Sequence, residues 1–529
     1  MSPFTHLASS EELWNSYCTF LDLNLADFMD IQLGLFKENL PLLTGSKIGK
    51  KIIGQSLPRS LEEFRQSVPT TTYSDYAALL TQKDESCLPA PVHCWAHTSG
   101  RSGTFKWIPI TRKAYETMGK RALASLFLST IEKDRQITLR PHDVAVYNTP
   151  PPPYLSGIIG QAVSDEFPLR VIPPFEVSKT LSFHERIEQG FKTALISRLD
   201  ILGSIAVVLA KMGEHFAKGT QKKAFSWIYF HPVAMARILR AMIRCRREQR
   251  PMLPKDLWTV KGIPTGGTDT AIYRDKLKEA WGVDPLEIYG STEGGTVATQ
   301  TWNRNGMIFF PDMVFLEFVP ESEWQRWNED SGYIPKTHLL NEVELGTRYE
   351  ILYTSLHGQP LMRYRINDVI RFTRFQDEEA NVALPHFEFI SRTHDFIDLA
   401  GFTGLIDEKT VWKAIENSQI PYIDWTIRKE SHRGDAVLHL YIEPTRDIKS
   451  GEIERAVHKE LALLNPFYAD YAAMICSDSL RVTVLKKGAF MNYIREKQAQ
   501  GADLAHLKPA HMNPTDSELN VLLDHPPVD

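Results

Sequence analysis

The chain has 529 residues, which exceeds the size at which a single hydrophobic core stops growing, so we expect two or more domains. Hydrophobic residues make up 43% and charged residues 24%, the proportions of an ordinary soluble globular protein. The formal net charge of −5, from 60 basic and 65 acidic residues, gives no electrostatic argument for binding nucleic acid or a membrane.

The cysteines and the apolar segments indicate the compartment. Five scattered cysteines without a Cys-x-x-Cys pair disfavour a disulfide framework and a structural zinc site, and they fit a reducing environment. The N-terminus shows no charged-then-apolar leader, and no apolar run approaches the ~20 residues that span a bilayer. We therefore expect a cytoplasmic protein.

Helix signals dominate the N-terminal part of the chain. Ser10 precedes two glutamates as a candidate helix cap, and apolar residues recur at helical spacing as far as Leu35. Leu61 begins a further helix that ends before Pro69. Two short strands are then expected, at 93–97 and 107–110.

The stretch between these strands, Thr98 to Lys106, combines four hydroxyl side chains, two glycines and a lysine. Glycine lets the backbone approach a ligand closely, while N–H groups, hydroxyls and the lysine can bind phosphate oxygens. The spacing of a Walker loop is absent. Taken alone, the stretch fits either a polyphosphate-binding loop or a polar turn in a β-hairpin.

A proline-rich segment follows a long helix expected at 111–133 and a strand expected at 143–147. Four consecutive prolines, 150–153, form a stiff extended segment that suits a linker or a rigid wall. Apolar elements on both sides favour a wall inside a domain. The candidates for lining a substrate pocket there are Tyr147, Tyr154 and Leu155, for which ordinary packing is an equally good explanation.

Helices and short strands alternate to about Gly282, and strands dominate from Met313 to Ile390. This order predicts an α/β fold with a β-rich subdomain. Within it, arginines spaced three to four residues apart between Arg237 and Arg250 predict the solvated face of a helix.

The pattern of expected helices and strands changes beyond Ser391. Helix and strand patterns there predict a compact α+β domain. From His511 onward the chain is rich in proline and acids, which predicts a tail that covers the surface or is partly disordered.

Three further segments can accompany the polar loop at one site. Ile263 to Asp269 is a strand-to-helix turn whose two adjacent glycines can lie against a flat base. Glu287 to Gly295 ends a strand with an aromatic ring, hydroxyls, a carboxylate and glycines, and Asp368 stands at the mouth of another strand. Each segment is weak alone, because such an aspartate is most often a turn residue and Thr292 could be a cap.

In this order, the four segments resemble the nucleotide-site motifs of the adenylate-forming ANL superfamily. The stretch 98–106 aligns without a gap with its Thr-Ser-Gly-Thr-Thr-Gly-x-Pro-Lys phosphate loop. Residues 289–293 resemble Tyr-Gly-x-Thr-Glu, and 364–368 resemble Tyr-Arg-x-Gly-Asp.

The resemblance narrows to the Gretchen Hagen-3 (auxin-responsive) acyl acid amido synthetases. The segments that resemble this family run from about Leu61 to Pro509 and are 62–73, 346–351, 362–365, 488–490, 501–503 and 507–509. The chain is more similar to a distant bacterial-type member than to a plant enzyme. The resemblance implies that a small carboxylic acid is adenylated by ATP with Mg²⁺ and that the acyl group passes to an amine, with an amino acid expected.

The resemblance also implies site residues. It gives catalytic roles to Lys106, Thr292, Glu293 and Lys508, with Glu293 as the Mg²⁺ ligand and Thr292 on the α-phosphate. The implied nucleotide contacts are Thr98, Ser99, Gly100, Ser102, Gly103, Gly266, Gly267, Thr268, Tyr289, Gly290, Ser291, Thr292, Asp368 and Arg392. Among them the loop residues would hold the β- and γ-phosphates, Gly266, Gly267 and Tyr289 the adenine, and Asp368 the ribose hydroxyls.

The implied architecture is the ANL fold. An N-terminal adenylation domain would span residues 1–391, a hinge 392–398 and a mobile C-terminal domain 399–529. Lys508 would reach the α-phosphate and acyl oxygens, although an exposed lysine before a proline explains it equally well. Three residues depart from the pattern, Arg101 and Phe105 in the loop and Asn367, which replaces a glycine but tolerates positive φ.

Two other functions remain open at this stage. An acyl-CoA ligase shares the adenylation step and differs only in its thiol acceptor. A catalytically inactive nucleotide-binding protein is disfavoured because the charged members of the site are intact, and a hydrolase because no Gly-x-Ser-x-Gly segment occurs. We expect a monomer that acts on an aromatic or small apolar acid.

Overall fold

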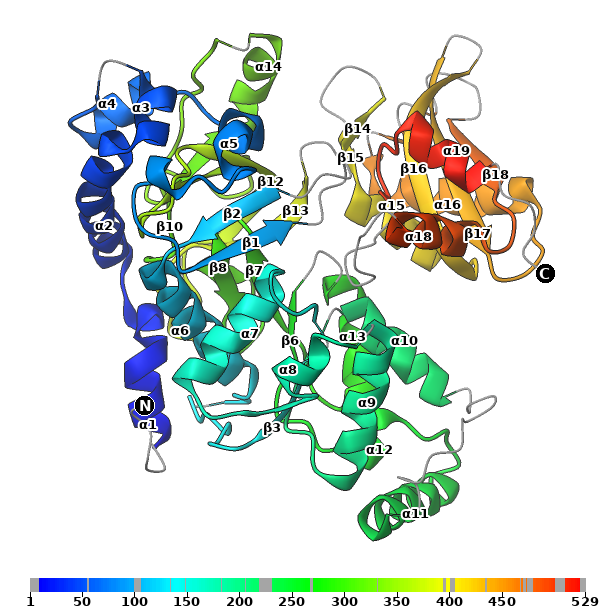
Figure 1. Cartoon of the computed structure of the whole chain (residues 1–529). Helices are drawn as coiled ribbons and strands as arrows, with labels where there is room; N and C mark the ends of the chain where they lie inside the picture. Colours follow the sequence, from blue (N-terminus) through cyan, green and yellow to red (C-terminus); the bar gives the residue numbers. More distant parts are fainter. Residues whose placement is uncertain are drawn as a thin grey trace. The chain divides into compact units, whose positions relative to one another are not determined.

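The computed structural model describes residues 9–54, 57–98, 106–133, 135–147, 149–181, 183–204, 206–217, 231–266, 270–330, 332–392, 396–399, 405–432, 435–466, 468–469, 472, 479–499 and 510–523. The chain divides into two compact units (Figure 1). Unit 1 comprises Met1–Ile366 and Ile370–Glu388, and unit 2 comprises Asn367–Val369 and Phe389–Asp529. Within the described residues, no helix is both long and apolar enough to cross a membrane.

Unit 1 begins with helices, as the sequence predicts. They are α1 (Ser10–Leu13), α2 (Leu25–Gly45), α3 (Lys47–Ile53), α4 (Leu61–Ser67) and α5 (Tyr73–Leu80), with short helical turns at Trp14–Cys18, Thr19–Asp22 and Glu85–Cys87. The prediction of Ser10 as the first cap is wrong. Ser9 caps α1, because Glu12 stands three residues after it and the two residues exchange side-chain and backbone hydrogen bonds of 2.7 and 3.1 Å.

The polar loop of the sequence connects an antiparallel hairpin. Its strands are β1 (Cys94–Thr98) and β2 (Lys106–Ile110), and the register places Thr98 opposite Lys106. Helix α6 (Arg112–Ser129) follows, capped by the Thr111 hydroxyl, and ends before the predicted Lys133. The earlier end coincides with Thr130, whose hydroxyl donates to the carbonyl oxygen of Phe127.

A small parallel sheet comes next in the order β4-β3-β5, made of β3 (Val144–Tyr147), β4 (Arg170–Ile172) and β5 (Ile201–Gly203). The helices of this region are α7 (Leu155–Glu166), α8 (Phe175–Ser178), α9 (Phe183–Ile196), α10 (Ala206–Ala217), α11 (Pro232–Arg247), α12 (Pro254–Leu257) and α13 (Thr270–Trp281). The proline segment lies inside unit 1 as expected, since the N–H of His97 in β1 donates to the Pro153 carbonyl oxygen at 3.0 Å.

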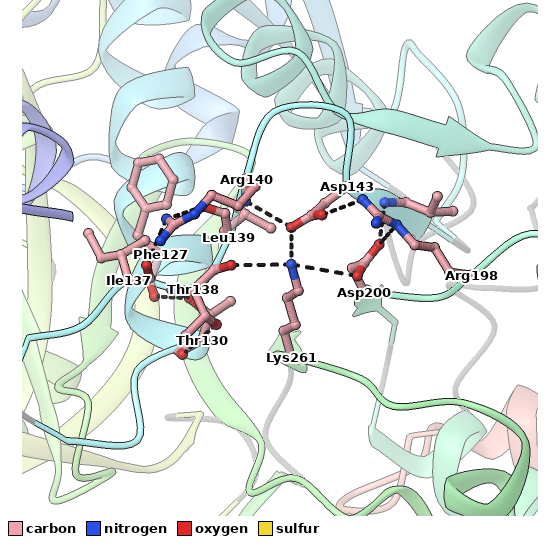
Figure 2. A network of polar contacts seen from close by, with 11 residues as sticks. Phe127, Thr130, Ile137, Thr138, Leu139, Arg140, Asp143, Arg198, Asp200 and Lys261 are labelled. Atoms are coloured by element: carbon pink, nitrogen blue, oxygen red, sulfur yellow. Dashed lines mark hydrogen bonds and ion pairs between the residues drawn. The ribbon is translucent and has the colours of Figure 1, made fainter. Parts of the chain in front are cut away.

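A buried ionic network ties the starts of three strands together (Figure 2). Asp143 precedes β3, Asp200 precedes β5 and Lys261 shortly precedes β6 (Pro264–Gly266). The Lys261 ammonium lies 2.6 Å from Asp143 and 3.6 Å from Asp200, and Arg198 lies 2.7 Å from each carboxylate. These are the amino ends of parallel strands, whereas ligands of α/β sheets bind at the carboxyl ends, so the network is structural.

Replacing Lys261 by methionine is expected to destabilise unit 1 by about 1–3 kcal/mol. The substitution leaves the Asp143 carboxylate, 1% exposed, with one cation fewer. Urea denaturation of the full chain measures the loss. Lys276→Met is the matched control, because Lys276 is half-exposed and its 3.9 Å pair with Glu214 is weak. Equal stabilities of the two variants would contradict a structural role for the network.

The β-rich region predicted from the sequence is an eight-stranded sheet in the order β10-β11-β12-β13-β9-β8-β7-β6. Besides β6, its strands are β7 (Leu286–Ser291), β8 (Gly295–Gln300), β9 (Met307–Phe309), β10 (Val314–Pro320), β11 (Arg348–Ser355), β12 (Tyr364–Arg374) and β13 (His386–Arg392). Helix α14 (Glu321–Glu329) follows β10. Strands β7 and β6 pair in parallel, so their carboxyl ends lie at the same edge.

Unit 2 contains the expected α+β domain. Its elements are β14 (Phe396–Asp398), β15 (Leu405–Asp407), α15 (Glu408–Asn417), β16 (Tyr422–His432), β17 (Asp435–Pro444), α16 (Ser450–Leu464), β18 (Leu480–Val484), α18 (Ala489–Ala499) and α19 (Asp516–Leu523). The described part of the tail beyond His511 packs onto the rest of unit 2, which agrees with the first of the two predicted alternatives, a tail that covers the surface. Residues Leu519 and Leu522 of α19 are buried against Tyr441, Phe490 and Tyr493, because their spacing puts both on one apolar helix face.

His511 itself joins two parts of unit 2. Its ring stacks on Trp425 at 4.3 Å, and its two nitrogens lie 2.7 Å from a Glu408 oxygen and 2.8 Å from an Asp424 oxygen. Burial disfavours the imidazolium, but the two carboxylates outweigh it and raise the pKa of His511 to about 9.

This arrangement predicts a pH-dependent stability of unit 2. A group whose pKa is higher in the folded state stabilises fully below its unfolded pKa of about 6.5 and loses that contribution as the pH rises through 9. We expect the free energy of unfolding to fall between pH 6.5 and 9 in the native chain. His511→Gln should be less stable at pH 6 and should lose most of this slope in denaturation series at several pH values.

Candidate active site

The hairpin turn between β7 and β8 carries the central motif of the site. Thr292, Glu293 and Gly294 connect the two strands, and the Gly294 N–H donates to the Ser291 hydroxyl at 3.1 Å. Glycine is required on both sides of this turn. A Cβ on Gly290 would lie 2.4 Å from the Gly295 carbonyl oxygen, and Gly295 has φ +74°. The turn therefore holds Thr292 and Glu293 half-exposed at a fixed place beside the end of β6.

Glu293 is oriented by a buried tyrosine. The Tyr364 hydroxyl donates a hydrogen bond to a Glu293 carboxylate oxygen at 3.1 Å, and the tyrosine is 2% exposed. Burial first, and then the neighbouring Glu293 carboxylate, raises the pKa of Tyr364 well above its usual range. The phenol therefore stays a hydrogen-bond donor and fixes one of the two carboxylate oxygens.

Lys106 lies at the same group of tyrosines. Its ammonium is 5.6 Å from the centre of the Tyr73 ring, and Tyr73 packs against the buried cluster that contains Tyr76 and Tyr364. The Tyr73 hydroxyl also accepts from the Trp107 N–H at 2.7 Å, which attaches it to β2. This cluster links the cation at one end of the polar loop to the carboxylate in the β7–β8 turn.

Gly266 ends β6 next to the same turn. In the parallel register it stands opposite Ile288, and among the described residues an added Cβ would meet only the Ile288 carbonyl oxygen, at 3.9 Å. The described residues therefore leave the space above this glycine open, which is what a flat ligand surface needs. Tyr289, expected to stack on adenine, is 8% exposed and packs edge-on against Phe387 at 5.9 Å, so its stacking role stays a prediction.

Asp368 and Arg392 lie together in unit 2. The Arg392 Nε is 3.4 Å from an Asp368 carboxylate oxygen, with the aspartate side chain 7% and the arginine 53% exposed. The preceding Asn367 has φ +63°, which confirms that asparagine maintains the turn where the family pattern has glycine. The carboxylate is thus held at the start of β12, with a cation beside it.

The three candidate pocket residues all lie near the carboxyl end of β3 and the start of α7. The Tyr147 hydroxyl donates to the Ser156 carbonyl oxygen at 2.8 Å, and its ring fills the space above Gly203, where a Cβ would be 2.7 Å away. Tyr154 packs edge-on against His97 at 4.3 Å, and Leu155 is half-buried. Their contacts account for packing, and a role in binding the acid remains a prediction.

Part of the predicted site lies outside the described residues. This holds for Ser99, Gly100, Arg101, Ser102, Gly103, Phe105, Gly267, Thr268, Lys508 and hinge residues 393–395, and for the side chain of Thr98. Among the residues that the structure describes, no group of three or more His, Cys, Asp or Glu could hold a metal ion. Glu293 could still bind Mg²⁺ that arrives with ATP, since this ion usually keeps waters and phosphate oxygens and needs only one or two carboxylates.

Sequence reasoning assigned no role to Tyr73, Tyr364 or Arg363, although it quoted the segments that contain them. Arg363 is fully buried and lies 3.1 Å from Glu317, and its guanidinium donates to the carbonyl oxygens of Arg65 and Val68. Thr71 also exchanges two backbone hydrogen bonds with Arg363 and Arg365. The two separated signature segments are therefore neighbours, which the sequence could indicate only by their joint occurrence.

Comparisons with known proteins agree with this geometry. The GH3 family N-terminal domain matches residues 19–166, and the GH3 family central domain matches residues 307–392. A search of curated proteins found no significant match.

Solved structures show the same fold. An AtGH3.15 acyl acid amido synthetase in complex with 2,4-DB matches with a TM-score of 0.67 and 17% identity, over 99% of this chain and 97% of that chain. A 2-hydroxyisobutyryl-CoA ligase in the postadenylation state matches with a TM-score of 0.66 and 13% identity, over 99% of this chain and 95% of that chain. The fold is therefore that of the adenylate-forming enzymes, as expected, and two separate segments of the chain are similar to GH3 family domains.

Proposed function

We propose that the chain is an ATP-dependent acyl acid amido synthetase. It would adenylate a small carboxylic acid with release of pyrophosphate and then pass the acyl group to an amine, with an amino acid as the expected acceptor. The observation that supports this most is the Glu293 carboxylate, which stands in a glycine-flanked turn, is oriented by Tyr364 and is linked to Lys106 through the tyrosine cluster. Two GH3 domain models match segments of the same chain.

The first step joins two anions, so the site must supply positive charge and oriented donors. A carboxylate oxygen of the acid attacks the α-phosphorus of ATP, and the bond to pyrophosphate breaks. Lys106, with Ser99, Gly100, Ser102 and Gly103 of the polar loop, would bind the departing phosphates. Thr292 would donate to the α-phosphate, and Glu293 would hold the Mg²⁺ that accompanies ATP.

The remaining residues would bind the nucleoside. Gly266, Gly267 and Thr268, with Tyr289, Gly290 and Ser291, would border the adenine, and Asp368 would accept the ribose hydroxyls. In the second step the amine attacks the acyl carbon, AMP leaves and the amine loses a proton. The segment 392–398, beginning at Arg392, would be the hinge between domains 1–391 and 399–529, and Lys508 would act in the first step.

Asp368→Ala is expected to raise the KM for ATP by about 10²–10⁴-fold and to change kcat less, because two hydrogen bonds to a charged acceptor are worth roughly 1.5–3 kcal/mol each. Initial rates at varied ATP concentration test this. An unchanged KM for ATP would contradict the contact between Asp368 and the ribose hydroxyls. Arg392→Ala is the informative companion, since it removes the neighbouring cation and leaves the carboxylate.

The reaction is tested by pyrophosphate release from ATP and Mg²⁺ across a panel of aromatic and small apolar acids, with amino acids and coenzyme A added separately. Acid-dependent release that rises with an amino acid, with an amide found by mass spectrometry, supports the proposal. A rise with coenzyme A alone would instead favour an acyl-CoA ligase, the alternative to which the second similar structure points. Binding of ATP without acid-dependent release across the panel would favour a non-catalytic nucleotide-binding protein.

Two further properties belong to the same proposal. The four described cysteines are free, which supports a reducing, cytoplasmic location. A monomer is expected, and sedimentation of the purified chain measures it.

A further inference from the structure

Helix α11 carries a row of large apolar side chains that face solvent. Met235, Leu239, Met242 and Ile243 are 52%, 58%, 42% and 44% exposed, and we call them the α11 stripe. Their spacing of three, four and eight residues puts them on one side of the helix. The opposite side holds the buried Ala234, Ala241 and Cys245, and α11 packs against α9 and α12 (Figure 1).

Arginines flank this stripe, and they fall into two groups. Arg237 donates to the carbonyl oxygens of Ala194 and Ser197, and Arg250 forms a bidentate pair with Asp256, so both hold α11 in place. The other group is exposed. Its members Arg240, Arg246 and Arg247 form no ion pair with any described residue, and Arg244 reaches Asp256 only at 3.9 Å.

The sequence prediction of a solvated arginine face is therefore right for this second group. It does not account for the apolar stripe beside them. No acidic residue occurs within Pro232–Arg247, so α11 is strongly basic although the whole chain has a net charge of −5. The average charge of the chain thus conceals a basic local surface.

A groove continues the stripe at the carboxyl end of α11. It has a volume of about 470 Å³ and is lined by Met242, Cys245, Arg246, Gln249, Arg250 and Met252. Two methionines give it an apolar wall, with the exposed guanidinium group of Arg246 beside it. This is a combination of an apolar and a cationic surface, which fits an acyl chain with an anionic head group.

From these features we propose that α11 docks on an anionic lipid surface. A helix with an apolar stripe and arginines on its flanks lies in the plane of a membrane interface, where the long arginine stems reach the phosphates. A second copy of α11 is a poor occupant, because the exposed arginines of two copies would repel one another. A protein partner would need a groove that is lined by both apolar and acidic side chains and that matches the convex side of the helix. A lipid surface, in contrast, adapts to the shape of the helix.

The inference is independent of the reaction proposed above, because α11 holds none of the predicted site residues. It replaces the expectation, based on net charge alone, that the chain has no affinity for membranes. The binding would be peripheral and reversible, since it relies on one surface helix.

Vesicle flotation of the full chain tests the proposal. We expect the protein to float with vesicles that contain phosphatidylserine, to float much less with pure phosphatidylcholine and to be released by salt. The triple variant R240E/R246E/R247E should bind anionic vesicles roughly 100-fold more weakly, at about 1 kcal/mol per arginine. The variant M235Q/L239Q/M242Q should lose binding to the same vesicles while its charge is unchanged.

Matched controls separate these effects from a general change in charge or hydrophobicity. The variant K50E/K51E/R455E makes the same change in net charge at exposed sites outside α11, and Leu463→Gln removes a leucine that is 69% exposed. Both should float like the native chain. Circular dichroism and pyrophosphate release in solution show that each variant is folded.

Three results would overturn the proposal. Equal flotation with neutral and anionic vesicles would contradict it, as would native flotation of both α11 variants. A dimer in sedimentation that M235Q/L239Q/M242Q abolishes, without any vesicle binding, would assign the stripe to a second copy of the chain. If adenylation fails in the native chain but vesicle binding persists, the reaction is wrong and the docking surface stands.

Discussion

Replacing Glu293 by glutamine is expected to lower acid-dependent pyrophosphate release by about 10²–10³-fold, the effect of losing one preorganised electrostatic group at developing charge. Glutamine keeps the size of the side chain and an oxygen that can accept the Tyr364 hydrogen bond. It removes the negative charge that would bind Mg²⁺. The fold should therefore be unchanged, and initial rates at saturating ATP measure the loss.

The companion variants separate metal binding from orientation. Tyr364→Phe leaves the carboxylate in place but removes the 3.1 Å hydrogen bond, so about a tenfold loss is expected, partly recovered at high Mg²⁺. Lys106→Ala, which removes the cation near Tyr73, should lower the rate of adenylation at least as strongly as Glu293→Gln does. If the three single variants Glu293→Gln, Lys106→Ala and Asp368→Ala all kept full turnover, the site would be assigned to the wrong residues.

Replacing Arg363 by methionine is expected to destabilise unit 1 by about 3–5 kcal/mol, because it leaves a buried carboxylate without its partner. Glu317 is fully buried and accepts from the Arg363 guanidinium at 3.2 Å and from the Thr337 hydroxyl at 2.7 Å. The arginine also satisfies two carbonyl oxygens of the segment that leads into the Thr71 bridge. Thermal unfolding and urea denaturation of the full chain measure the change.

The double variant Arg363→Met/Glu317→Met is the decisive control for this pair. Removing both charges leaves no unpaired buried charge. The double variant should therefore lose clearly less free energy of unfolding than Arg363→Met alone. Arg371→Met is the matched surface control, since its pair with Glu388 is partly exposed and should contribute at most about 1 kcal/mol. A loss in Arg363→Met no greater than in Arg371→Met would contradict the buried pair as a main support of unit 1.

The sequence determined the local elements and the order of the motifs. Strand and helix patterns predicted β1, β2, α6 and strands β10 to β13 of the large sheet, because side-chain periodicity directly reflects which face is buried. Motif spacing indicated the resemblance to the GH3 family, two of whose domain models match segments of the chain, and it predicted roles for Glu293 and Asp368. The sequence also predicted that Asn367 can adopt a positive φ, because the tolerance of positive φ is a property of the residue type.

The tertiary structure alone decided which residues orient one another. The Tyr364 hydroxyl meets Glu293 across 71 positions of sequence, and Arg363 meets the carbonyl oxygens of Arg65 and Val68 across nearly 300. No periodicity encodes such contacts, because they depend on how strands distant in sequence pair in the sheet. The same reason explains the tail, where buried Leu519 and the doubly paired His511 follow from packing against α18 and β16, not from their polar neighbours in the sequence.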